Sequence, residues 1–232
     1  MNEKYLAETP LLDYKHSSIQ KLIKDNGWLQ LNGYDRVGAA YNYVRNTIKF
    51  GYNSSDELKS SQVFADSYGQ CNTKATLLMS LFRALGIPCR FHGFTIDKKL
   101  QKGAITGIFY RIVPKNIIHS WVEIYFENKW INLEGFILDE KYLSQLQNKF
   151  NNVEGSFSGY GVATDNFKNP PIKWQGKDTY IQKEGINNDL GVFNNPDDFY
   201  KKNGSNLSGI KKWLYANFIR KLMNLNVSKI RG

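Results

Sequence analysis

Hydrophobic positions with helical spacing dominate the first part of the chain. Between residues 35 and 50, apolar side chains recur three or four positions apart among polar ones, which predicts an amphipathic helix. Between residues 71 and 85 the apolar positions extend around most of the helix circumference, and Gly86 and Pro88 then end the pattern. This second segment is predicted to be the central helix of the core.

Alternation of apolar and polar residues then predicts strands. Residues 90–96, 118–126 and 129–133 alternate, and the turn-forming pair Glu127-Asn128 separates the last two. A short turn between two alternating segments predicts an antiparallel hairpin. Residues 97–117, between the first strand and the hairpin, are predicted to form a long excursion over the surface.

The last hundred residues are less regular. Residues 139–150 can form a short helix, but the following stretch is rich in Asn, Gly, Asp and Pro. Near the end, Ile210, Leu214, Phe218 and Leu222 repeat every four positions beside Trp213 and Leu225, which predicts a basic amphipathic helix. We therefore divide the chain into an N-terminal helical lead-in (1–34), a core (35–150), an irregular, pocket-lining extension (151–205) and a C-terminal basic helix (206–232).

Composition and charge limit the function classes. With 232 residues, 41% of them hydrophobic, the chain can bury a core. Its net charge of +10 at first suggests nucleic acid or an anionic membrane. Residues 201–232, however, hold eight basic residues and no acidic one, which leaves a net charge of only +2 on residues 1–200. We therefore expect no nucleic-acid partner. The terminal helix either docks on an anionic membrane surface or acidic partner, or packs on the domain with its lysines in water.

The numbers and spacing of cysteines and histidines argue against a secreted, disulfide-rich protein and against a metal site. Two cysteines argue against a disulfide-rich scaffold, although one bridge between them stays open. The N-terminus lacks the apolar stretch of a signal peptide, and no window approaches the length of a membrane-spanning helix. We expect a soluble, cytoplasmic protein. Three histidines without a Cys-x-x-Cys pair, and no phosphate-binding or dinucleotide motif, predict neither metal nor cofactor.

Cys71 is a candidate nucleophile because it follows Gly69-Gln70 at the predicted start of the buried helix. Unpaired backbone N–H groups at a helix N-terminus favour a thiolate over a thiol. The same N–H groups can stabilise the oxyanion that forms when a carbonyl is attacked. The alternative is a buried cysteine that only packs, which is common for free cysteines.

His119 and Glu134 are a second candidate pair. His119 opens one strand of the predicted hairpin and Glu134 closes the other, so both lie at the same end of it. A carboxylate there would orient the imidazole and support the imidazolium that forms when the ring takes a thiol proton. The alternative is an ordinary cross-strand polar contact.

Together these residues resemble the transglutaminase-like superfamily of papain-like thiol enzymes. The family pattern is Gly-x-Cys opening a helix, a helix exit of the type seen at residues 83–90, His-x-Trp-x-Glu on a strand and Trp-x-x-x-Asp on the next. The matching segments span roughly residues 35–135. The resemblance implies an α+β fold of the papain-like, transglutaminase-core type, in which N-terminal helices and a central helix carrying the cysteine pack against an antiparallel sheet.

The resemblance also implies roles for individual residues. Cys71 would be the nucleophile, His119 the general base and later acid, and Glu134 would stand where the family has Asp. Asn132, on the same strand face, is the alternative partner of the imidazole. For the oxyanion, the Cys71 N–H is one donor, and Gln62 and Gln70 are candidates for a second. We interpret His92 as a structural or surface histidine and Cys89 as a residue that packs in the core.

The implied activity is acyl transfer through a thioester. Family members hydrolyse amides and peptides or form amides with an amine, and the surrounding pocket decides which. We expect residues 97–117 and the glycine-rich residues 155–161 to line that pocket, and a peptide, protein or small amide to be the acyl donor. Glu in place of Asp supports one alternative from another class, a catalytically inactive binding or scaffold protein that keeps the fold.

Overall fold

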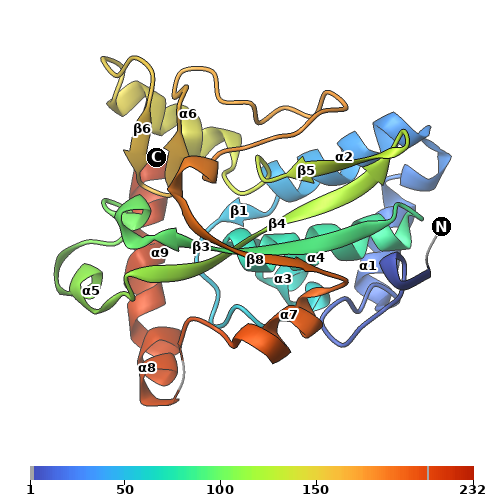
Figure 1. Ribbon diagram of the computed structural model, residues 1–232, viewed down its shortest axis with the longest axis horizontal. Coiled ribbons are helices and arrows are strands. Elements are labelled where there is room, and N and C mark those ends of the chain that lie inside the picture. The colour runs from blue at the N-terminus through green and yellow to red at the C-terminus, as the bar shows by residue number, and fades with distance from the viewer. Residues whose placement is uncertain (1–2, 208) are drawn as a thin grey trace.

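A four-stranded antiparallel sheet forms the centre of the computed structural model, which describes residues 3–207 and 209–232 (Figure 1). The strands lie in the order β5 (Lys129–Leu133), β4 (Asn116–Phe126), β3 (Cys89–Asp97) and β8 (Ile186–Phe193). Between β4 and β5, Glu127 and Asn128 both have positive φ, 47° and 63°, as a tight hairpin turn requires. The predicted strands and hairpin are confirmed.

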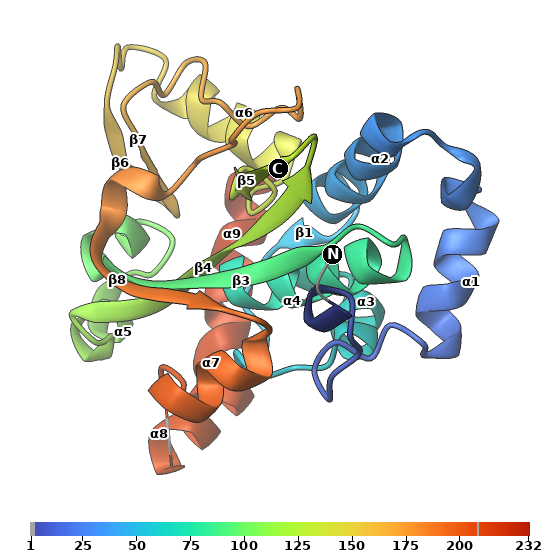
Figure 2. The same ribbon diagram turned by 45° about the vertical axis from the view of Figure 1, so that its right-hand side comes forward.

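Helix α4 (Cys71–Ala84) packs against β3 and β4 and carries the core. Every residue from Cys71 to Arg83 is buried, as its nearly continuous apolar circumference predicts. Helix α2 (Gly33–Asn46) packs on α4 and ends before the predicted residue 50, because the chain leaves the helix to form β1 (Lys49–Phe50) beside β2 (Tyr68–Gly69). Figures 1 and 2 show these helices on one face of the sheet.

The other elements surround this centre. Helix α6 (Glu140–Lys149) is the short helix predicted after the hairpin. The remaining elements of the described chain are α1 (Ser17–Asp25), α3 (Ser60–Asp66), α5 (Gly107–Ile112), α7 (Pro196–Asn203), the small hairpin β6 (Phe157–Gly159) and β7 (Val162–Thr164), and 3₁₀ turns at Glu3–Tyr5, Trp28–Gln30, Lys98–Gln101 and Lys183–Gly185.

The expectation of an irregular extension is wrong for residues 186–203. Strand β8 completes the sheet by pairing with β3, and α7 follows it. The ring of Phe199 on α7 lies so close to Gly93 of β3 that a Cβ there would be 2.2 Å from a ring carbon, so only glycine fits. The strand escaped prediction because it is an edge strand with a mostly polar, partly exposed sequence that shows no alternation.

The C-terminal helix packs on the domain, but not through the face that its spacing suggested. Helix α8 (Gly209–Leu214), a π turn (Tyr215–Ile219) and α9 (Arg220–Arg231) run without interruption along the sheet's helical face (Figure 1). Four residues spaced four apart face the core, and Met223 and Val227 among them are buried. These inner residues are Tyr215, Ile219, Met223 and Val227. The predicted apolar face, one position earlier in the sequence, is exposed instead.

Polar contacts fix this helix at several points along its length. Asn224 exchanges hydrogen bonds with the backbone N–H and carbonyl of Tyr52, at 2.7 and 3.0 Å. Near the end, Arg231 forms an ion pair of 2.8 Å with Asp139, the N-cap of α6. No helix in the described part of the chain is long and apolar enough to cross a membrane.

Candidate active site

The N-terminus of α4 presents Cys71 at the edge of the core. Cys71 is the first residue of the helix and is 8% exposed. Gln70, the N-cap, and Thr73 form a reciprocal capping box that satisfies helix N–H groups. Gly69 must be glycine because a Cβ there would lie 2.7 Å from Oγ1 of Thr73 and 2.9 Å from Cγ of Lys74. The Gly-x-Cys motif is thus a packing requirement of the turn into this helix.

His119 and Glu134 meet in a fully buried hydrogen bond. Nε2 of His119 on β4 lies 2.7 Å from Oε1 of Glu134, and neither side chain is exposed. An ionised carboxylate can only accept, so Nε2 carries the proton and donates it. In the hairpin register Leu133, the last residue of β5, lies opposite Val122, so the chain beyond it continues toward His119 on β4.

The chain after residue 178 holds Glu134 in place. Its other oxygen, Oε2, accepts hydrogen bonds of 2.8 Å from the backbone N–H groups of Ile181 and Gln182. Two backbone donors at one oxygen leave the other oxygen free to bind the imidazole. Asn132, the alternative partner, points elsewhere and donates to Asp178 and to the hydroxyl of Tyr180. The structure therefore pairs His119 with Glu134 and not with Asn132.

Cys71 acts on the same imidazole electrostatically. Nδ1 of His119 makes no hydrogen bond of regular geometry within the described part of the chain, and the Cys71 sulfur lies close to the ring. Burial disfavours the charged ring, but the Cys71 thiolate and, after it, the Glu134 carboxylate outweigh burial and raise the pKa of His119 to about 10. The arrangement favours a protonated His119 ring at neutral pH.

A polar network that sequence reasoning missed joins the cysteine helix to the histidine strand. Asn72, next to Cys71, donates to the carbonyl of Ile118 at 3.2 Å and accepts from the hydroxyl of Ser120 at 2.9 Å. These two residues flank His119 in the sequence. Asn72 thereby fixes the position of one candidate residue relative to the other. A lone Asn after a Cys gives no sequence signal for this role.

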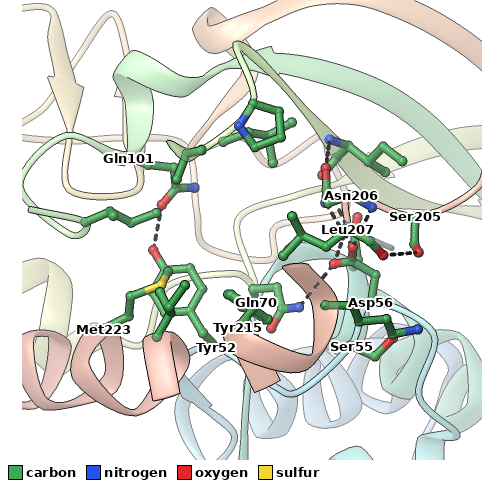
Figure 3. Close-up of a pocket in the computed structure, with 18 of the residues that line it drawn as sticks. Tyr52, Ser55, Asp56, Gln70, Gln101, Ser205, Asn206, Leu207, Tyr215 and Met223 are labelled. Carbon is green, nitrogen blue, oxygen red and sulfur yellow. Dashed lines mark hydrogen bonds between the residues drawn. The ribbon is translucent and has the colours of Figure 1, made fainter. Parts of the chain in front are cut away.

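Asp56 extends the network to the C-terminal segment. Its Oδ1 accepts from Asn72 at 3.1 Å and from Nε2 of Gln70 at 3.3 Å. Its Oδ2 accepts from the backbone and the side chain of Asn206, whose own oxygen accepts from the N–H of Ile118 at 2.7 Å. Figure 3 shows Asp56 between Gln70 and Asn206. Three distant parts of the chain therefore meet beside Cys71.

The two candidates for a side-chain oxyanion donor, Gln70 and Gln62, lie at different distances from the site. Gln70 lines the same cavity as Cys71, with its Nε2 held by Asp56. Gln62 is exposed on α3, donates to Asp66 and does not line that cavity. Of the two, only Gln70 lies where a substrate bound at Cys71 could meet it.

Cys71 is one of the residues that line a cavity of about 450 Å³. Figure 3 shows this cavity with other residues of its wall. The 97–117 segment lines it, as predicted, through residues that include Gln101, Ile105 and Ile117. The prediction for residues 155–161 is wrong, since none of them lines the cavity. They pack behind the 97–117 segment instead, where the N–H groups of Tyr160 and Gly161 donate to the carbonyls of Lys102 and Leu100. The C-terminal helix supplies the wall expected from them.

The remaining cysteine and histidine of interest are structural. Cys89 and Cys71 are both free thiols, and Cys89 is completely buried against α4. Burial raises the pKa of the Cys89 thiol to about 11, although Arg83 beside it acts in the opposite direction. His92 bridges Glu123 and Asp189 across three strands. Burial opposes its charge, but these two carboxylates outweigh burial and raise its pKa.

Comparison with known proteins agrees with this geometry. The model of the transglutaminase-like superfamily matches residues 29–135. This segment is similar to a transglutaminase-like core. It contains Cys71, His119 and Glu134, whereas the Ile181 and Gln182 donors and the C-terminal helix lie beyond it. The similarity to this superfamily therefore covers the candidate site residues but not the segments that support them.

Three proteins illustrate the range of similarity. The uncharacterized protein YebA of Bacillus subtilis (strain 168) is 29% identical over 113 residues, which are 44% of this chain and 15% of YebA. The structure of a "putative cysteine protease" from Cytophaga hutchinsonii aligns over 84% of this chain and 47% of its own, with 16% identity and a TM-score of 0.47. Red sea bream transglutaminase aligns over 56% and 25%, with 16% identity and a TM-score of 0.31. The chain thus spans less than half the length of each.

The charge balance at His119 gives the first prediction. Replacing Cys71 by Ala removes the negative charge that most raises the pKa of His119, so the ring should lose its proton at a distinctly lower pH. Glu134→Gln should also lower the pKa, because its carboxylate acts in the same direction. Ring-resolved NMR titration measures both effects. His92, held by other carboxylates, is the internal control and should titrate unchanged. An unaltered His119 titration in Cys71→Ala would contradict the proposed charge pairing.

Proposed function

We propose that this chain is a thiol-dependent acyl-transfer enzyme that works through a thioester on Cys71. The observation that carries the proposal is a buried chain of three interacting groups: the Cys71 sulfur, the His119 ring and the Glu134 carboxylate. Each group suits one role: nucleophile, general base and acid, and orienting carboxylate. The similarity of the core to a thiol enzyme family supports the same assignment.

The acylation step follows from the positions of these groups. The Cys71 thiolate attacks the carbonyl carbon of an amide or peptide-type donor, and the carbonyl oxygen becomes an oxyanion near the N-terminus of α4. The backbone N–H of Cys71 is the first donor to that oxyanion and Gln70 is the candidate for a second. When the carbon–nitrogen bond breaks, the His119 imidazolium gives its proton to the leaving amine. Cys71 then carries the acyl group as a thioester.

The second step restores the thiol. Neutral His119 takes a proton from water or from an incoming amine as that nucleophile attacks the thioester, and the Cys71 thiolate leaves. Water gives a carboxylic acid, so the enzyme would be a peptidase or amidase. An amine gives a new amide, so it would be an amide-forming transferase. Both reactions use the same three side chains.

An inactive scaffold with this fold is the alternative, and its main support was Glu in place of Asp. The longer side chain reaches the imidazole here because the backbone N–H groups of Ile181 and Gln182 hold its second oxygen. The substitution therefore does not favour the scaffold. The buried charge arrangement around Cys71 would also be costly to keep without a use for it.

Trapping the acyl-enzyme tests the proposal. The intact protein is mixed with p-nitrophenyl acetate, or with a cell extract as a source of natural donors, quenched in acid and analysed by peptide mass spectrometry. One acyl group should appear on Cys71 and none on Cys89. Cys71→Ala should keep the fold by circular dichroism and lose at least about a thousandfold in turnover, and Glu134→Gln should lose about a hundredfold or more. Turnover of acyl donors by Cys71→Ala at the normal rate would contradict the proposal.

A further inference from the structure

The cavity beside Cys71 has a polar end and an apolar body. At the polar end the side chains of Gln70, Asn72 and Asn206 all donate hydrogen bonds to Asp56. Away from it the wall is mainly aliphatic and includes side chains from the 97–117 segment, β4 and the C-terminal helix. Six of these are Ile105, Val113, Ile117, Leu207, Ile219 and Met223.

Several polar side chains of the cavity wall already have hydrogen-bond partners. Tyr52 donates to Gln101 at 2.6 Å across one side of it (Figure 3). Asp56 accepts hydrogen bonds from three side-chain amides, so its oxygens are already occupied. Among the lining residues that the structure describes, Lys212 is the one cationic side chain. A polar or cationic substituent entering the apolar body would therefore lose its hydration, and the aliphatic side chains there would offer it no hydrogen-bond partners.

We propose that the acyl group accepted by Cys71 carries a long aliphatic or aromatic substituent that fills this apolar body. The inference rests on the proposed function, because it identifies which acyl donor the same cysteine would attack. A volume of about 450 Å³ is within the range of small-ligand pockets, roughly 300–1,000 Å³, and is too large for an acetyl group alone. Burial of each methylene of the donor in this wall contributes binding energy, so specificity should follow chain length.

A chain-length series tests this inference. The acylation rate of Cys71 is measured with straight-chain p-nitrophenyl esters from acetate to dodecanoate. Since one buried methylene changes affinity by up to about fourfold, the second-order rate constant should rise roughly two- to fourfold per methylene and level off when the cavity is full. Positively charged acyl chains of equal length should react at least about tenfold more slowly.

Two variants of one helix provide a matched pair. Ile219→Trp should fill the cavity and lower the ratio of dodecanoyl to acetyl acylation at least about tenfold, whereas Leu222→Trp, on the exposed face, should leave the ratio unchanged. A ratio that is flat with chain length, or equally reduced in both variants, would overturn the inference while acylation of Cys71 still supports the proposed function. Failure of every ester to acylate Cys71 would instead contradict the proposed function.

A separate observation concerns the outer face of the C-terminal helix. Large apolar side chains stand in water there, with 79% of Ile210, 58% of Trp213 and of Phe218, and 59% of Leu225 exposed. On a regular α-helix, each step of four residues rotates the side-chain direction by about 40° around the helix axis. The π turn at Tyr215–Ile219 widens one turn and counteracts this drift for Leu214, Phe218 and Leu222. An exposed apolar stripe of this kind indicates an interaction surface.

We infer that this stripe binds an anionic lipid surface, with the helix lying in the plane of the interface. Residues 201–232 contain no acidic residue, and Lys221 and Lys229 are exposed on the same helix. Aromatic and aliphatic side chains combined with lysines are typical of interfacial helices. The inner face of the helix is occupied by the domain, so binding through the stripe needs no unfolding.

Vesicle flotation tests the membrane inference with the full chain. The protein should float with phosphatidylserine-containing vesicles, less with phosphatidylcholine alone, and less in high salt. The double variant Phe218→Ser/Leu222→Ser should weaken partitioning at least about tenfold. The control Leu29→Ser removes an exposed leucine that is distant from this helix in the sequence, and it should leave partitioning unchanged. No flotation, or a concentration-dependent dimer that the double variant abolishes, would overturn the inference.

Discussion

The buried hydrogen bond between Glu134 and His119 is the interaction on which the rest of the site depends. A carboxylate taken out of water costs several kcal/mol unless its charge and lone pairs find partners. Two backbone N–H groups serve one oxygen of Glu134 and the imidazole serves the other. The ring is thereby fixed in one tautomer with Nδ1 left for the thiol side. Loss of any of these partners would leave a buried charge uncompensated.

The second constraint is the distance between two separate elements, the start of α4 and the start of β4. A cysteine at a helix N-terminus and a histidine on a strand can act together only if the helix and the strand keep a fixed position relative to each other. Asn72 fixes that position by forming hydrogen bonds to the residues on both sides of His119. Asp56 and Asn206 continue the network, so the segment leading into the C-terminal helix is part of the site's support. The same helix then closes the cavity.

The strongly patterned parts of the fold could be predicted from the sequence. Helix α4 and the β4–β5 hairpin have clear periodicities and end signals, and the hairpin geometry alone placed Glu134 near His119. The choice of Glu134 over Asn132 could not be decided, because it depends on Ile181 and Gln182, which follow an unpatterned stretch. Tertiary contacts that cross long sequence separations leave no local signal.

Two other features were not predicted correctly from the sequence, and each has a simple physical cause. Strand β8 is an edge strand whose polar residues face water, so its sequence reads as a loop. The C-terminal helix is apolar on two faces, and spacing alone does not say which face the core takes. The residues on its inner face form part of the core and part of the cavity wall. The residues with the more regular apolar spacing in the sequence are exposed to solvent. Packing, and not periodicity, decided between them.

The central claim is that Cys71, His119 and Glu134 form one reactive unit, and thiol alkylation tests it most directly. The rates at which iodoacetamide modifies Cys71 and Cys89 are measured in the same intact protein at pH 6. The account predicts that Cys71 reacts at least about tenfold faster than an unstructured cysteine peptide, while Cys89, with its pKa raised to about 11, stays unmodified. Glu134→Gln should lower the Cys71 rate. A Cys71 that reacts no faster than the peptide, and equally in both proteins, would contradict the account.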